Sequence, residues 1–301
     1  MDKEQIGRLS TEVCNPRSRQ MDRMEIRELL TLMNEEDEKA VQAVKEALPE
    51  IERAVKEIIC ALKNGGRLIY VGAGTSGRMG VMDAVECVPT FSTTDEVIAI
   101  MAGGEGAFVR AVEGAEDSQE LAVEDLRGIG LKKEDVVLAI AASGRTPYCI
   151  GALKEARKKK ARCMSLACNH DALISQYADV AIEVDAGPEV LTGSTRLKAG
   201  TCQKLILNMI STTAMVGIGK VYNNYMVDMK ATNYKLADRA KRIVMECTQC
   251  SEKQAEEVLK GADGSIKTAV VMLLTGVTRT EAERKTKNFR RFCKSLYLER
   301  E

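Results

Sequence analysis

The segment RLIYVGAGTSGR, residues 67–78, joins an apolar run to a loop rich in glycine and hydroxyl groups. The apolar run is typical of a buried β-strand, and a helix-compatible stretch follows the loop. Glycines let a ligand approach the backbone closely, and the first amides of a helix are unpaired hydrogen-bond donors. The segment therefore predicts a strand, a loop and a helix that together bind an anionic group such as a phosphate.

A second loop of the same type follows another apolar run. Residues 136–140 (VVLAI) precede residues 142–147 (ASGRTP), and a helix-compatible stretch comes next. The loop hydroxyls and the first amides of that helix would again offer donors to an anion. Two facing hydroxyl-rich loops suit one compact phosphosugar, so we expect both to contribute to a single site.

The first loop also has the G-x-G-x-x-G spacing of dinucleotide-binding folds. Such folds need an acidic residue at the end of the second strand, roughly 20 residues further on, to hold the ribose. Asp95 and Glu96 have about that spacing, yet they precede the apolar run Val97–Met101 instead of ending it. The second loop lacks the glycine spacing, so the sequence favours a phosphosugar over a dinucleotide.

Short apolar runs alternate with helix-compatible stretches, which is the pattern of a β-α-β fold. The sequence predicts an α/β fold: a three-layer αβα sandwich with a mainly parallel five-stranded sheet, in which ligands bind beyond the carboxyl ends of the strands. Both loops lie at that edge. The apolar runs are at residues 67–72, 97–101, 136–142, 163–168 and 179–184.

The remaining sequence predicts helices. Residues 37–62 carry apolar side chains at helical spacing, and residues 195–216 contain few turn signals, so each stretch is expected to form one long helix. The first 35 residues are polar, and after about residue 240 short helices alternate with turns. We expect an N-terminal arm and helix at residues 1–40, a phosphosugar-binding domain at 41–238 and a small helical domain at 239–301.

The composition excludes several classes of partner. The 301 residues contain 44 Lys and Arg and 44 Asp and Glu, so no net charge attracts nucleic acid or anionic lipid. No apolar run approaches the ~20 residues of a membrane-spanning helix, and the amino terminus lacks the apolar core of a signal peptide. We therefore expect a cytoplasmic protein that binds neither nucleic acid nor membrane.

Ten cysteines are scattered along the chain, and we expect reduced thiols that pack as small apolar groups. Cys247 and Cys250 form a C-x-x-C pair, but no second pair or nearby histidine completes a zinc site. Ser251 and Gln254 resemble a capping box that opens the next helix, which favours a structural role for Cys250. The single histidine, His170, has no matching nucleophile, so we expect acid and base chemistry from carboxylates and no metal.

Two glutamates stand out by their surroundings. Glu86 lies beside Val85, Cys87 and Val88, at the end of the apolar helix that begins at the first loop. Partial burial there would raise its pKa and let it donate a proton near neutral pH. Glu116 lies in the segment GAED, after an apolar run. The residues alone favour a capping or surface role for each glutamate.

Five segments together carry a resemblance to one family, and the stretch from Gly193 to Thr201 is specific to that family and its relatives. The segments are residues 72–78 (GAGTSGR), 83–91 (DAVECVPTF), 111–117 (AVEGAED), 141–148 (AASGRTPY) and 187–201 (GPEVLTGSTRLKAGT). They closely resemble the N-acetylmuramic acid 6-phosphate etherases, and the resemblance spans nearly the whole chain. It implies a sugar isomerase (SIS) type domain and a homodimer. The related glucokinase regulatory proteins bind phosphosugars without etherase activity.

The resemblance implies a lyase that cleaves the D-lactyl ether at C3 of N-acetylmuramic acid 6-phosphate in cell-wall (murein) amino sugar recycling. The products would be N-acetylglucosamine 6-phosphate and D-lactate. With the sugar ring open, loss of the proton at C2 expels lactate from C3, and water then adds to the unsaturated aldehyde. By position, Glu86 matches the family's proton donor and Glu116 its second catalytic glutamate, the base at C2. This route requires no cofactor and no metal.

Across SIS domains, equivalent hydroxyl groups and loop amides hold the phosphate. The resemblance therefore assigns this role to the two loops, whose candidate residues are Gly74, Thr75, Ser76, Gly77, Ser143, Gly144, Arg145 and Thr146. Ser194 and Lys198 are further candidates beside the substrate. Lys198 is equally well explained by a bond to a carbonyl or a carboxylate.

Two other functions stay open at this point. A phosphosugar-binding regulator would share the loops, although the related regulatory proteins carry two tandem SIS domains and this chain has length for one. A phosphosugar isomerase would share the loops and a carboxylate base, but it would interconvert aldose and ketose without releasing lactate.

Overall fold

The computed structural model describes residues 7–110, 112–231, 233–287, 289 and 292–293. The chain divides into two compact units. The sheet unit comprises Met1–Val85 and Asp95–Ser211, and the helical unit comprises Glu86–Thr94 and Thr212–Glu301. The three-part division at residues 40 and 238 stays a prediction.

The sheet unit is built on five parallel strands in the order β2-β1-β3-β4-β5. The central strands β1 and β3 are buried on both faces, which explains why each is a continuous apolar run and not an alternating one. The five expected runs all form strands, so the predicted parallel sheet is confirmed. The strands are β1 (Leu68–Gly72), β2 (Val97–Met101), β3 (Val136–Ala141), β4 (Arg162–Ala167) and β5 (Val180–Glu183).

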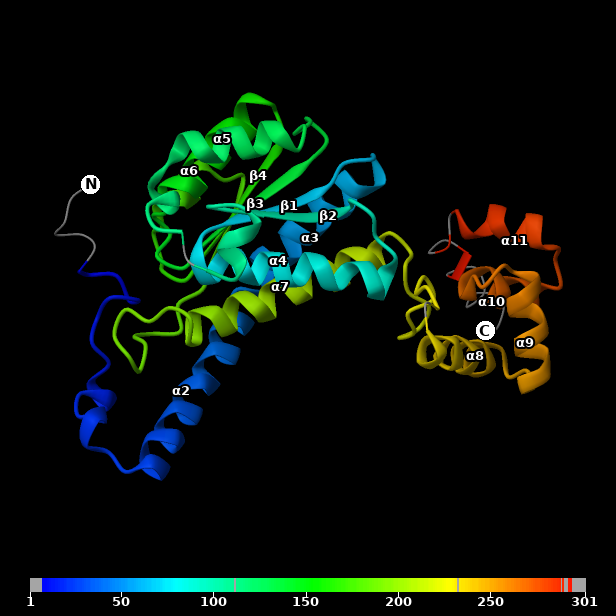
Figure 1. The fold of residues 1–301 in the computed structure, drawn as a ribbon, viewed down its shortest axis with the longest axis horizontal. Coiled ribbons are helices and arrows are strands. Elements are labelled where there is room, and N and C mark those ends of the chain that lie inside the picture. Colours follow the sequence, from blue (N-terminus) through cyan, green and yellow to red (C-terminus); the bar gives the residue numbers. More distant parts are fainter. Residues whose placement is uncertain (1–6, 111, 232, 288, 290–291, 294–301) are drawn as a thin grey trace. The chain divides into compact units, whose positions relative to one another are not determined.

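Helices cover both faces of the sheet (Figure 1). On one face, α5 (Gln119–Gly128) and α6 (Pro147–Lys158) pack against buried side chains of β1 and β3. On the other face lie α3 (Leu48–Lys63), α4 (Gly74–Phe91) and α7 (Lys198–Gly217). This arrangement confirms the three-layer αβα sandwich.

The first turn of α4 packs directly on the end of β1. A Cβ atom placed on Gly77 would lie 2.8 Å from the carbonyl oxygen of Gly72 and 2.9 Å from the Cβ of Met101. Only glycine fits at such a distance, because real Cβ atoms do not approach backbone so closely. The glycine therefore fixes where the amides at the start of α4 point.

The prediction of one long helix at residues 37–62 is wrong. The structure has two helices, α2 (Ile26–Glu46) and α3, which are separated at Ala47. Pro49 lies in the first turn of α3, where it needs no amide hydrogen, and it cannot continue a helix from α2 because its ring clashes with the preceding turn. The helix also starts earlier, within the segment expected to be a polar arm.

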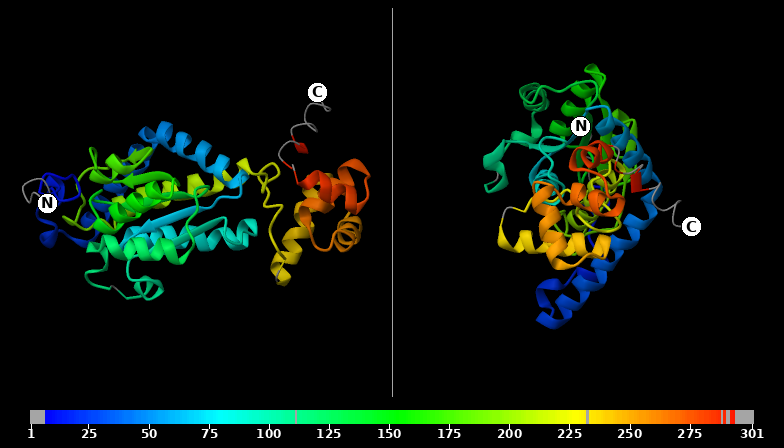
Figure 2. Two further views of the ribbon diagram at one scale, coloured as in Figure 1. Left: turned by 90° about the horizontal axis from the view of Figure 1, so that it is seen from above. Right: turned by 90° about the vertical axis from the view of Figure 1, so that its right-hand side faces the viewer.

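Within the described ranges, short 3-10 helices lie in connections between these elements. They are η1 (Pro16–Ser18), η2 (Met21–Arg23), η3 (Glu105–Phe108), η4 (Ala115–Asp117) and η5 (Leu173–Tyr177). Helix α2 extends away from the sheet in Figure 1 and in the right-hand view of Figure 2, and much of its surface is exposed.

A buried carboxylate ties the N-terminal segment to α7. The oxygens of Glu36 accept hydrogen bonds from Asn15 (2.9 Å), Arg17 (3.1 Å), Lys39 (2.6 Å) and Lys198 (2.8 Å), and the Glu36 side chain is 1% exposed. We call these five residues the N-terminal clamp. Four donors compensate the charge that burial would otherwise penalise, so the clamp holds α2 and the segment before it against the start of α7.

The helical unit contains α8 (Tyr234–Thr248), α9 (Glu252–Gly261), α10 (Ile266–Thr275) and α11 (Arg279–Thr286). Buried side chains of these helices, among them Val244, Ile266 and Val270, form its core. Ser251 and Gln254 form a capping box at the start of α9, as the sequence predicts. The described part of this unit therefore has the small helical fold expected near the carboxyl end.

Replacing Glu36 with Gln is expected to destabilise the protein by about 3 kcal/mol, because it leaves the buried Lys198 ammonium without a counter-charge. Urea unfolding measures the difference. Glu35→Gln is the matched control: Glu35 contacts the same Arg17, but its side chain is 49% exposed, so its change should be within about 1 kcal/mol. Equal effects of the two substitutions would show that burial of Glu36 is not what gives the clamp its strength.

The clamp also predicts how stability depends on pH. Burial alone would raise the pKa of Glu36, but hydrogen bonds from Lys198 and Lys39 outweigh it and lower the pKa from 4.5 to about 2. A carboxylate with a depressed pKa contributes its full stabilisation above its unfolded pKa, and the contribution is lost as the pH falls through the folded pKa. Between pH 4.5 and 2, the free energy of unfolding should therefore fall more for wild type than for Glu36→Gln. Parallel curves of unfolding free energy against pH would show that Glu36 is not the source of the pH dependence.

Candidate active site

The first loop lies where the sequence predicts it, between β1 and α4. Thr75 and Ser76 belong to the first turn of α4, whose leading amides have no earlier helical carbonyl to bond. Thr75 is half-buried and Ser76 is buried. The Ser76 Oγ accepts a hydrogen bond of 2.9 Å from Nε2 of Gln203 on α7. The loop thus combines helix amides and hydroxyl groups, as an anion site requires.

The second loop connects β3 to α6 at the same edge of the sheet. Because β1 and β3 are adjacent and parallel, with Gly72 opposite Ile140, the structure brings the two loops together. Gly144 has a φ of +67°, and a Cβ on it would lie 2.5 Å from the Cβ of Ala172, so this tight turn needs glycine. The backbone of Arg145 donates to the Ser143 Oγ at 3.3 Å.

Two polar groups of the second loop are not used within the described part of the chain. The Nε of Arg145 is buried and has no acceptor there. Thr146 is the N-cap residue of α6, but its side chain makes no capping hydrogen bond. A buried guanidinium N–H without an acceptor is costly, and a bound anion at this loop would satisfy it.

Glu116 lies beside the first loop. It belongs to η4 and lines a cavity of about 220 Å³ together with Ala73, Gly74 and Arg78. The structure therefore brings one predicted catalytic glutamate next to a predicted phosphate loop.

Arg78 holds the segment that leads to Glu116. Its guanidinium donates to the carbonyl oxygens of Ala107 (2.8 Å) and Phe108 (2.9 Å), both in η3. Arg78 is the last residue of the GAGTSGR motif, and the motif alone does not indicate this role. Its position one turn into α4 lets one side chain connect the first loop to η3.

Glu86 is exposed in this chain, so the burial expected from its apolar neighbours is wrong for the single chain. On α4 the buried side is occupied by Ala84 and Cys87, whereas Val85 and Val88 are 58% and 48% exposed. Adjacent positions on a helix point in different directions, so apolar neighbours in sequence do not bury a residue. Glu86 belongs to the helical unit and Glu116 to the sheet unit.

Ser194 and Lys198 precede and open α7. Ser194 is half-buried, whereas Lys198 is 1% exposed and its ammonium is bound to Glu36 in the N-terminal clamp. Of the two alternatives for Lys198, the structure supports the carboxylate pair.

Glu189 is a functional candidate that the sequence reasoning missed. Its carboxylate accepts hydrogen bonds from the amides of Lys198 (3.0 Å) and Ala199 (2.9 Å), and so caps the start of α7. Burial raises its pKa, and these amide bonds offset part of that effect. It fixes the loop that carries Ser194.

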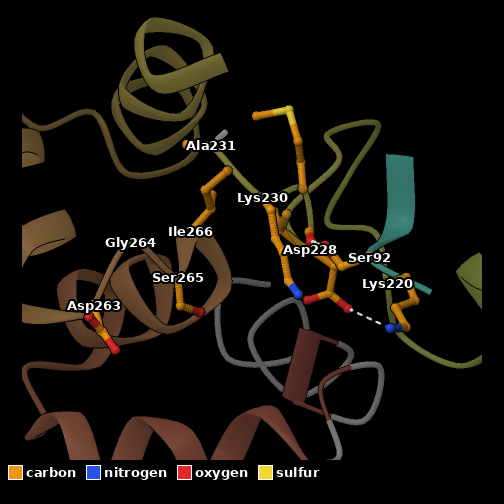
Figure 3. Close-up of a pocket in the computed structure, with 11 residues that line it drawn as sticks. Ser92, Lys220, Asp228, Lys230, Ala231, Asp263, Gly264, Ser265 and Ile266 are labelled. Carbon is orange, nitrogen blue, oxygen red and sulfur yellow. Dashed lines mark hydrogen bonds and ion pairs between the residues drawn. The ribbon is translucent and has the colours of Figure 1, made fainter. Parts of the chain in front are cut away.

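A separate cavity of about 520 Å³ lies within the helical unit (Figure 3). Ser92, Lys220, Asp228 and Lys230 line it, and an ion pair of 3.5 Å joins Lys220 to Asp228. Asp228 also pairs with Lys267 at 2.7 Å, so its charge is compensated within the unit.

Neither a metal site nor a membrane span is visible in the described residues. No group of three or more His, Cys, Asp or Glu side chains within those ranges has the geometry to hold a metal ion. Across the same ranges, every helix is too short or too polar to cross a bilayer.

The fold and the two loops define the class of protein to which the chain belongs. The chain matches the models of the glucokinase regulatory protein N-terminal SIS domain at residues 50–157, the SIS domain at 121–215 and the C-terminal lid domain of glucokinase regulatory protein at 223–263. A phosphoheptose isomerase from Neisseria gonorrhoeae superposes with a TM-score of 0.51 at 18% identity, over 63% of this chain and 98% of that one. The sheet unit has a SIS fold.

Full-length relatives identify the family. The N-acetylmuramic acid 6-phosphate etherase of Mycolicibacterium smegmatis is 56% identical over 281 residues, which cover 93% of this chain and 94% of that protein. The enzyme of the same name from Shouchella clausii is 54% identical over 290 residues, or 96% and 98% of the two chains. The chain belongs to the N-acetylmuramic acid 6-phosphate etherase family and is an enzyme.

Ser143→Ala is expected to weaken binding of N-acetylglucosamine 6-phosphate, because Ser143 is predicted to donate a hydrogen bond to the charged phosphate. Such a bond contributes about 1.5 to 3 kcal/mol, so the dissociation constant should rise ~10- to 100-fold. Isothermal titration calorimetry measures it. Thr213→Ala, an exposed hydroxyl on α7, is the matched control and should bind as wild type does. Unchanged affinity in Ser143→Ala would place the phosphate away from the second loop.

Proposed function

We propose that this enzyme cleaves the D-lactyl ether at C3 of N-acetylmuramic acid 6-phosphate and yields N-acetylglucosamine 6-phosphate and D-lactate in cell-wall amino sugar recycling. The observation that carries the proposal is the 54–56% identity to etherases of this name over more than nine-tenths of the chain. The site supports it, since two hydroxyl-rich loops meet at one sheet edge beside a glutamate.

The first part of the proposal concerns the phosphate group of the substrate. We assign it to the amides and hydroxyls of Thr75, Ser76, Ser143 and Thr146, with the free Nε–H of Arg145 as a further donor. Helix N-termini favour negative charge, and both loops lead into helices. A phosphosugar anchored there has its sugar carbons beyond the loops, toward the cavity that Glu116 lines.

The reaction needs one base and one acid. In the ring-open sugar the C1 aldehyde acidifies the proton at C2. Glu116 takes that proton, the electron pair forms the C2–C3 double bond, and the C3–O bond breaks as Glu86 protonates the departing lactate oxygen. Water then adds at C3 and a proton returns to C2. The enzyme is accordingly a lyase that works with two carboxylates and requires no metal or cofactor.

We also propose that the enzyme is a homodimer. Helix α2 exposes large apolar side chains: Ile26, Leu30 and Val41 are 78%, 61% and 62% exposed. Exposed apolar groups along one helix favour a protein partner, and a second copy of this chain is the partner that the family resemblance implies.

Cytoplasmic location is proposed from the cysteines. All ten are free thiols, as suits a reducing compartment.

A phosphosugar-binding regulator is the second candidate, because two of the matching domain models are named for glucokinase regulatory protein. The two functions differ in one observable, the release of lactate.

The decisive experiment incubates the purified protein with N-acetylmuramic acid 6-phosphate in heavy-oxygen water. Equimolar lactate and hexosamine phosphate, with the label at the C3 hydroxyl, are expected from elimination followed by hydration. EDTA should leave the rate unchanged. Binding of the sugar phosphate without lactate release would support the regulator instead.

Glu86→Gln and Glu116→Gln are each expected to lower kcat by at least ~100-fold while the affinity for N-acetylglucosamine 6-phosphate stays within a factor of two, because each removes proton transfer and leaves the phosphate contacts. Glu116→Gln should also stop exchange of the C2 proton with deuterated solvent. Glu105→Gln, an exposed glutamate of η3, serves as the control. Full activity in either variant would remove that glutamate from the mechanism.

A further inference from the structure

Gln203 contacts the first phosphate loop from inside the protein. It lies on α7 and is 0% exposed. Its side-chain Nε2 lies 2.9 Å from the Ser76 Oγ and 3.8 Å from the Sγ of Cys168. A fully buried glutamine against a loop hydroxyl is not needed for packing, since an apolar side chain of similar size would fill the same space without burying polar atoms.

The hydrogen-bond pattern fixes which end of the amide faces Ser76. Both Nε2 hydrogens have acceptors in this orientation, Ser76 and Cys168, while the Cys168 thiol hydrogen goes to the carbonyl oxygen of Ala199 at 3.7 Å. Turning the amide over would exchange these two Nε2 bonds for contacts of Oε1 and would put the NH2 group where Oε1 now has no hydrogen-bond partner among the described residues. The Ser76 oxygen is therefore the acceptor in its bond with Gln203.

This pattern decides what Ser76 can do. A hydroxyl group has one hydrogen to donate, and the bond from Gln203 occupies a lone pair and not that hydrogen. Among the described residues, the Ser76 side chain makes one hydrogen bond, and its partner is Gln203. The hydroxyl hydrogen of Ser76 therefore remains available to a ligand that binds at the start of α4.

We propose that Gln203 is a positioning residue that orients the Ser76 hydroxyl as a donor and so makes the first loop select an acceptor-only group, a phosphate monoester. The inference rests on the proposed function, which assigns Ser76 to the phosphate. The Oε1 of Gln203 is buried without a donor in the described part of the chain. The protein thus bears the cost of an unpaired carbonyl to keep the amide N–H groups at this position.

A double-mutant cycle tests the proposal. Wild type, Gln203→Met, Ser76→Ala and the double variant are compared by KM and kcat for N-acetylmuramic acid 6-phosphate and by the dissociation constant of N-acetylglucosamine 6-phosphate. Gln203→Met should raise KM and that constant about three- to tenfold with little change in kcat, because the hydroxyl loses its orientation. In the Ser76→Ala background the same substitution should have no further effect.

Two further variants separate positioning from packing. Cys202→Ala changes the neighbouring buried residue of α7, whose Sγ faces the carbonyl oxygen of Ala40 and not Ser76; it should lower the melting temperature without changing KM. Gln203→Glu keeps the shape but presents acceptors to Ser76, which would turn the hydroxyl hydrogen away from the ligand. It should weaken phosphosugar binding more than Gln203→Met does, and it provides the test if the Met variant does not fold.

The outcomes distinguish this inference from the proposed function. Independent, multiplying effects of Gln203→Met and Ser76→Ala would overturn the positioning role while leaving Ser76 at the phosphate. An unchanged KM in Ser76→Ala would remove the phosphate from the first loop and the role of Gln203 with it. Lactate release by wild type decides separately whether the protein is an etherase.

Discussion

The contact between Gly77 and the end of β1 is the constraint on which the candidate site depends. The first turn of α4 sits so close to Gly72 and Met101 that no side chain fits between them. This distance aims the first amides of α4 at the sheet edge. It also sets the place from which Arg78 reaches the carbonyl oxygens of Ala107 and Phe108. This close packing therefore positions both the first loop and the side chain that holds η3.

Helix α7 organises the other side of the sheet unit through buried polar side chains. Lys198 bonds to Glu36, Gln203 to Ser76, and Asn208 and Ser211 to Asp83 at 2.6 Å and 3.1 Å. Tyr70 of β1 completes the group, since its hydroxyl lies 2.9 Å from Asp83. Because these side chains each bond to a specific partner, they favour one register and one rotation of the helix against the sheet, which apolar packing alone would not guarantee.

The sequence predicts the strands and the positions of the two loops correctly because local patterns determine them: apolar runs, then glycine and hydroxyl groups. Pro49 also signals the break between α2 and α3, although the apolar spacing across it suggested one helix. The partners of Lys198 and Gln203 were beyond reach, because they lie 162 and 127 residues away and no local pattern encodes them. The expected burial of Glu86 failed for a related reason. Exposure depends on which side of α4 faces the protein, and neighbours in sequence do not show this.

The N-terminal clamp has a consequence for how the chain folds during synthesis. Asn15, Arg17 and Glu36 leave the ribosome early, but their partner Lys198 follows 162 residues after Glu36. Until then the Glu36 carboxylate can bond only to Asn15, Arg17, Lys39 and water, and the N-terminal segment lacks its contact with the start of α7. Contacts between such distant positions form late, since the intervening chain must first be closed into a loop. The clamp residues Asn15, Arg17 and Glu36 are therefore synthesised well before their contact with α7 can form.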